Sequence, residues 1–89
     1  MNPSEAGVIE LAESEIADGI MLGRRGLNND AIEALDKAIA ACQTFTGDSL
    51  AVRELTAQAL GNKGAALGDL DRHEEAVTCY DAAIAIYRE

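Results

Sequence analysis

Few residues in this chain carry side chains that could do chemistry: two cysteines, Cys42 and Cys79, and one histidine, His73. Thiolates and an imidazole can bind zinc, but a zinc site needs its ligands at short, characteristic spacings. These three residues have no such spacing, and the cysteines fall inside patterns typical of helices. We therefore expect no metal site and no disulfide, and we interpret both thiols as small buried apolar groups.

The acidic residues and the glycines also fail to form a recognisable catalytic or cofactor site. Sixteen aspartates and glutamates are spread along the chain, so their spacing indicates no convergent acid and base. The glycine pairs at 19 and 23 and at 64 and 68 lie within helical patterns and lack the Lys-Ser/Thr that follows a phosphate-binding loop. The sequence predicts no enzyme activity and no cofactor.

The net charge of −9 narrows the range of partners. A negative field repels nucleic-acid phosphates and anionic lipid surfaces, so we expect neither as a partner. The N-terminal residues MNPSE do not begin a basic and then apolar leader, and no run of about 18 apolar residues is present. We expect a cytoplasmic protein whose partner is another protein or peptide, basic or apolar at the contact.

An internal repeat organises the 89 residues. Shifting the sequence by 45 residues aligns 12–44 with 57–89 and gives nine identical pairs, among them Gly19/Gly64, Gly23/Gly68 and Asp36/Asp81. A fixed period of this size indicates a repeat array. Each glycine inside a helix costs about 1 kcal/mol relative to alanine, so the recurrence of both pairs predicts a packing reason for them.

Helix start and stop signals divide each repeat into two helices. In the first repeat they predict a helix capped by Asn2, with Pro3 at its first position, that ends near Gly26, and a second helix from Asp30 to Phe45. In the second repeat they predict a helix capped by Asp48 or Ser49 that ends near Asp69, and a last helix opened by a capping box of Asp71 and Glu74. Short turns make each pair antiparallel.

The spacing of large and small residues resembles the tetratricopeptide repeat. All six positions of that motif are met in the second repeat by Leu60, Gly64, Leu67, Ala76, Tyr80 and Ala83. The first repeat offers Glu15, Gly19, Leu22, Ala31, Leu35 and Ala38, with Glu15 as the mismatch. The resemblance implies an all-α, right-handed superhelical array of two hairpins in one domain (1–89), with repeats at about 2–46 and 48–89.

Two departures from the family pattern stand out. The period is 45 residues where the family usually has 34, and the extra 11 residues are about three helical turns, which preserves the facing of each helix. The closing proline is also absent. We interpret the chain as a long-repeat variant, with HEAT-type helical repeats as the alternative that the glycine and alanine spacing disfavours.

The resemblance also implies a docking surface, because the family lines a concave groove with the first helix of each hairpin. The matching positions predict partner contacts at Glu13, Ile16, Ala17, Ile20, Arg24, Gln58, Asn62, Ala65 and Asp69. Asn62 corresponds to an asparagine that often holds a peptide backbone, and Arg24 offsets Asp69 or the helix end. His73 occupies a position where the family usually has an aromatic residue, so we interpret it as a packing residue.

Self-association is the structural alternative to this scaffold function. Each hairpin of such an array leaves an apolar face for its neighbour, and arrays usually need three repeats or a polar cap. No cap follows the last predicted helix in the sequence. We therefore expect an exposed face that favours a homodimer, or the stacking of a longer array, through Tyr80, Ala83, Ile84 and Tyr87.

Overall fold

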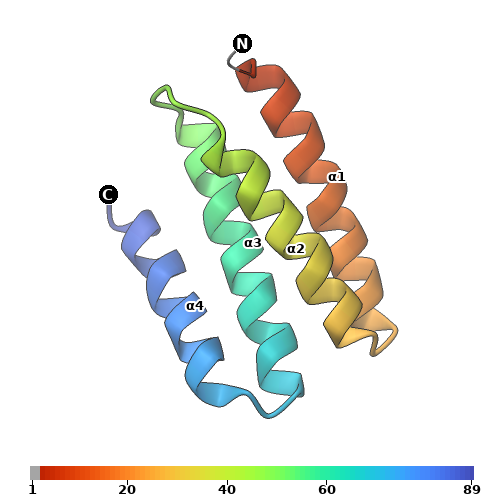
Figure 1. The fold of residues 1–89 in the computed structure, drawn as a ribbon. Coiled ribbons are helices and arrows are strands. Elements are labelled where there is room, and N and C mark those ends of the chain that lie inside the picture. The colour runs from red at the N-terminus through yellow and green to blue at the C-terminus, as the bar shows by residue number, and fades with distance from the viewer. Residues whose placement is uncertain (1–2) are drawn as a thin grey trace.

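The computed structural model describes residues 3–89, which form four helices and, within that range, no strand. Figure 1 shows α1 (Glu5–Arg24) antiparallel to α2 (Asn28–Gln43), and α3 (Leu50–Asp69) antiparallel to α4 (His73–Tyr87). The predicted all-α class with two helix hairpins is therefore confirmed. The first residues of α3 and α4, Leu50 and His73, follow those of α1 and α2, Glu5 and Asn28, by 45 residues.

The hairpins stack through α3. This helix packs against its own partner α4 and also against α2 and α1, whereas α4 packs on α3 alone among the described helices. In Figure 1, α4 accordingly lies at one edge of the molecule, beside α3 and away from α1. One long face of the second hairpin is thus left without a neighbouring helix.

The core lies mainly where α3 meets the first hairpin. Its buried residues are mostly small or aliphatic, namely Val8, Ala12, Ile16, Leu35, Ala38, Cys42, Val52 and Ala59. The second hairpin adds a smaller cluster of Leu67, Ala76 and Cys79. Alanine and cysteine at these contacts let the helix axes approach closely, so burial depends on backbone proximity as much as on side-chain bulk.

The turns inside the two hairpins both contain a residue with a positive φ angle. Gly26 has φ +77° and Asp71 has φ +60°, so each places a left-handed residue just after the preceding helix. The predicted ending at Gly26 is confirmed. The capping box of Asp71 and Glu74 was wrong, since α4 begins at His73 and its N-cap Arg72 makes no side-chain capping bond.

Of the other predicted helix starts, one is confirmed and two differ from the structure. Ser49 caps α3, and its Oγ accepts a hydrogen bond from the Val52 amide at 3.2 Å, as one of the two predicted caps should. Ser4, not Asn2, caps α1, and Pro3 precedes the helix instead of opening it. Asn2 lies outside the described residues. The second helix runs from Asn28 to Gln43, two residues earlier at each end than predicted.

Two pairs of glycines are related by the shift of 45 residues, and only the pair Gly19 and Gly64 has a packing reason. A Cβ at Gly19 would lie 2.7 Å from Leu35 Cγ, and one at Gly64 would lie 2.9 Å from the Tyr80 ring. A Cβ at Gly23 or Gly68 would meet nothing within 4 Å. The packing interpretation is therefore right for the first pair and wrong for the second.

Gly68→Ala is expected to raise the free energy of unfolding by about 1 kcal/mol, because alanine removes the backbone freedom of glycine at an open helical position. Urea denaturation followed by circular dichroism measures this change. A loss of stability would mean that the helix around residue 68 is strained in a way that an added Cβ worsens.

Candidate functional site

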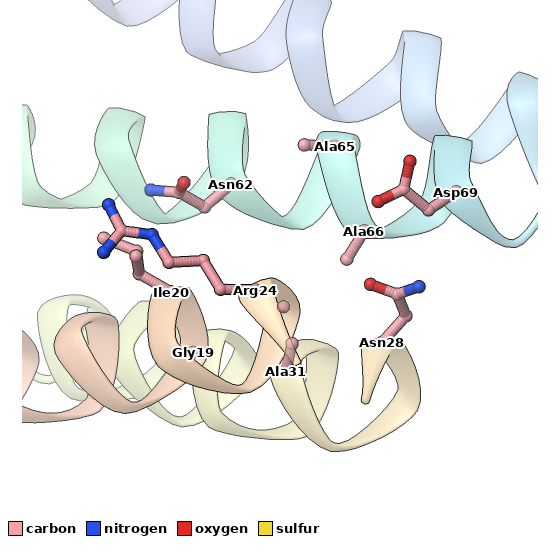
Figure 2. Close-up of a pocket in the computed structure, with 10 residues that line it drawn as sticks. Gly19, Ile20, Arg24, Asn28, Ala31, Asn62, Ala65, Ala66 and Asp69 are labelled. Atoms are coloured by element: carbon pink, nitrogen blue, oxygen red, sulfur yellow. The ribbon is translucent and has the colours of Figure 1, made fainter. Parts of the chain in front are cut away.

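A cavity of about 320 Å³ opens between α1 and α3, at the end where α2 begins. We call it the inner cavity. Figure 2 shows its lining, which comes from three helices and consists of Gly19, Ile20, Gly23, Arg24, Asn28, Ala31, Asn62, Ala65, Ala66 and Asp69. No residue of α4 contributes.

The hollow exists because its lining is made of small residues. Gly19 brings α1 against Leu35 of α2, and Gly23, one turn later, has no side chain to fill the space beside it. Ala65 and Ala66 line the opposite side from α3. The small residues of the lining therefore create the opening, and Gly19 among them also sets the distance between α1 and α2.

Hydrogen-bond acceptors gather at one end of the inner cavity. Asn28 is the first residue of α2, and its buried Oδ1 atom accepts no hydrogen bond from residues 3–89. The exposed carboxylate of Asp69, the last residue of α3, lies at the same end in Figure 2. A buried acceptor without a donor costs about 1–3 kcal/mol, so a donor supplied here would be favoured.

The other end of the inner cavity carries a cation and an oriented amide. Arg24 extends along α1 toward Asn62 in Figure 2, away from Asp69. The Asn62 amide nitrogen donates to the Gln58 carbonyl at 2.9 Å, which fixes the direction of the side chain. Among the described residues, no ion pair within 4.0 Å joins Arg24 to Asp69. Arg24 instead lies in the last turn of α1, so the structure supports the other predicted role of its charge, which is to offset the helix end.

The predicted docking residues divide into three groups. Ile20, Arg24, Asn62, Ala65 and Asp69 meet in the inner cavity. Glu13 and Ala17 are exposed on α1 but do not line this cavity, and Gln58 lines a different one. Ile16 is 4% exposed and belongs to the core, so its assignment to a docking surface was wrong, because α3 crosses over it.

Sequence reasoning missed five lining residues: Gly19, Gly23, Asn28, Ala31 and Ala66. Gly23 carried a usable signal, because it recurs at position 68 without closing a helix. Asn28 carried none, since it was assigned to a turn. Its position at the start of α2 depends on where that helix begins.

The face predicted for self-association borders a second, shallower cavity. We call it the end groove. It is about 450 Å³ and is lined by Ala57, Gln58, Gly61 and Asn62 of α3 and by Tyr80, Ala83, Ile84 and Tyr87 of α4. Tyr80, Ile84 and Tyr87 are 41%, 47% and 65% exposed. Ala83 is buried at the floor, so it offers little surface to a second chain.

The residues with reactive side chains do not converge. Cys42 and Cys79 are free and buried, and burial raises the pKa of the Cys79 thiol. His73 is exposed, with Nε2 3.5 Å from Asp71 Oδ1, so its interpretation as a packing residue was wrong. Residues 3–89 contain no group of three or more metal-ligating side chains. Within the same range, no helix has the length and hydropathy of a membrane span.

Together, the stacked hairpins and the inner cavity define a helical repeat protein. Residues 56–89, which cover α4 and most of α3, match the tetratricopeptide repeat family. The predicted resemblance is thus confirmed, and the match spans a single repeat, so the 45-residue period stays a prediction. No curated protein and no solved structure gives a match.

Proposed function

We propose that this chain is a protein-interaction scaffold that holds a peptide or helix of a partner in the inner cavity, between the first helices of its two hairpins. The family match supports a protein partner in general, since tetratricopeptide repeats are interaction modules. The arrangement of donors and acceptors in the cavity supports this particular surface.

The observation that carries the proposal is the unpartnered Asn28 oxygen beside Asp69. A carbonyl acceptor and a carboxylate at one end of a small-residue cavity fit a lysine or arginine side chain. The net charge of −9 would draw such a partner toward the chain. The partner's segment is therefore basic where it meets Asn28 and Asp69, and apolar or small where it passes Ile20 and Ala65.

The test starts from peptides selected for binding by the intact chain from a random display library. Enrichment in lysine and arginine is expected, with affinity falling as salt rises. Asp69→Asn should weaken the selected peptides at least about tenfold, the equivalent of 1.4 kcal/mol. Glu74→Gln, which makes the same charge change on an exposed residue outside the cavity, should leave their affinity within about twofold.

Gly23→Leu gives a steric test of the same proposal. Its Cβ meets open space, so the leucine side chain enters the inner cavity without a clash in the core. Gly68→Leu is the matched control, because Gly68 occupies the equivalent open position and lines neither the inner cavity nor the end groove. Selected peptides should lose binding to the first variant only. Equal binding to both variants would place the docking surface elsewhere.

Self-association through Tyr80, Ala83, Ile84 and Tyr87 is the second candidate function. The exposure of three of these residues supports it. Light scattering across a concentration series separates the alternatives, since a dimer that uses this face should dissociate in Tyr87→Glu. If the chain is a monomer at all concentrations, self-association is excluded and the scaffold function is the remaining candidate.

A further inference from the structure

The end groove repeats a surface that holds a helix elsewhere in the same molecule, and no helix within residues 3–89 covers it. We propose that it is a second docking site, which shares only Asn62 with the lining of the inner cavity, for an amphipathic helix of a partner protein. The helix has the chemistry of α3: aliphatic and small residues along one face and a lysine that meets Asp81.

The first argument is the equivalence of the two surfaces. Leu35, Ala38 and Cys42 of α2, with Ala12 and Ile16 of α1, are buried together with residues of α3. Positions 45 residues later are all part of the end groove, namely Tyr80, Ala83, Tyr87, Ala57 and Gly61. The helices of the second hairpin begin 45 residues after those of the first, so the end groove has the backbone arrangement of a surface that already accepts a helix.

The second argument is charge. Lys63 of α3 places its Nζ 2.7 Å from Asp36 Oδ1 of α2, and its side chain is only 25% exposed. This ion pair therefore lies at the edge of the α2 and α3 contact. Asp81 holds the equivalent position on α4, is exposed, and makes no ion pair within residues 3–89. A lysine on an incoming helix would find the same partner there.

The third argument concerns the positions at which the two surfaces differ. Tyr80 and Tyr87 replace Leu35 and Cys42, and tyrosine combines apolar area with a polar tip suited to a surface that is wet until it is bound. Gly61 replaces Ile16, and nothing lies within 4 Å of a Cβ built there. The end groove is deeper at this point, so its occupant carries a larger side chain than α3 needs.

A second copy of this chain that stacks head to tail fits the end groove poorly. In a head-to-tail stack, α1 of the copy would take the role of α3. Its residues in that register are Gly7, Glu10, Ser14 and Asp18, where α3 has Val52, Leu55, Ala59 and Lys63. Two aliphatic side chains would be lost and Asp18 would face Asp81, a like-charge contact that opposes association. A separate partner helix is therefore the better occupant.

The probe for this site is a synthetic peptide of residues 49–70 of the chain itself, which carries the α3 pattern. Titrated into the 89-residue chain, it should bind and shift the NMR signals of Tyr80 and Tyr87. Asp81→Lys should weaken binding at least about tenfold, and so should a peptide with Lys63→Glu. Combining the two changes should restore affinity, because the ion pair is re-formed in reverse. Glu74→Lys on the protein is the matched charge control.

Three outcomes would overturn the proposal. The reversed pair could fail to restore binding. The peptide could instead displace the chain's own α3, in which case the signals of the whole core would change and Asp81→Lys would have no effect. A dimer that occupies Tyr87 before any peptide is added would make a second copy the occupant. Gly23→Leu should leave peptide binding unchanged, so failure here is distinguishable from failure of the inner cavity.

Discussion

Leu35→Ala is expected to lower the free energy of unfolding by about 3 kcal/mol. Leu35 is 1% exposed and lies in the main core cluster, between α1 and α3. The same cluster includes Ala12, Ala38 and Ala59, whose methyl side chains are too short to fill the space that the lost side chain leaves. The substitution therefore loses the transfer free energy of the removed atoms and adds the cost of the cavity that remains.

The measurement is equilibrium urea denaturation followed by the helical circular-dichroism signal. Leu11→Ala is the matched control, since Leu11 is a leucine in the same hairpin but is 53% exposed, and it should change stability by less than about 0.5 kcal/mol. A chain of this size has only modest stability, so Leu35→Ala should also leave a measurable unfolded fraction without denaturant. Similar effects for the two leucines would mean that the packing of α2 against α1 differs from that described above.

The sequence predicted the four helices because their signals are local. Apolar residues recur at helical spacing, and the breaks at Gly26 and before Ser49 separate the segments clearly. The recurrence of Gly19 at Gly64 also predicted a packing reason for this glycine, and its missing Cβ does make room for the Tyr80 ring. Such contacts follow from spacing within one hairpin.

The ends of helices were harder to predict, because one motif fits two roles. Asp71 followed by Glu74 has the spacing of a capping box, yet Asp71 adopts a left-handed conformation that closes α3, as Gly26 closes α1. Local sequence cannot decide whether an aspartate ends one helix or begins the next. The shift from Asn2 to Ser4 has a similar origin, since either residue type can cap a helix.

The candidate site was predicted only in part, because its lining depends on how hairpins cross. Ile16 and Ile20 lie one turn apart on the same face of α1, so periodicity treats them alike. The structure separates them: α3 covers Ile16, whereas Ile20 lines the inner cavity. The crossing of α1 and α3 is a tertiary feature, and it decides which residues of an apolar stripe become core and which become surface.

Gly19→Ala is expected to lower the free energy of unfolding by about 2 kcal/mol, although alanine is the better helix former. The new Cβ would lie 2.7 Å from Leu35 Cγ and 2.8 Å from Cδ2. Leu35 is fully buried, so relief of this clash requires its side chain to shift within the core or α1 and α2 to separate. Gly64→Ala is the informative comparison, because its clash is with a Tyr80 ring that is 41% exposed and free to swing outward. Its effect should stay within about 0.5 kcal/mol of zero.

A double-mutant cycle tests the cause of the Gly19 effect. If the clash with Leu35 is responsible, Gly19→Ala should cost nothing in a Leu35→Ala background, where the opposing side chain is gone and only the gain in helix propensity remains. The coupling free energy between the two positions should then exceed about 2 kcal/mol, well above the value for independent sites. If the two effects are additive, the destabilisation by Gly19→Ala does not come from the contact with Leu35. The recurrence of Gly19 and Gly64 would then need a reason other than the close packing of the two helices within each hairpin.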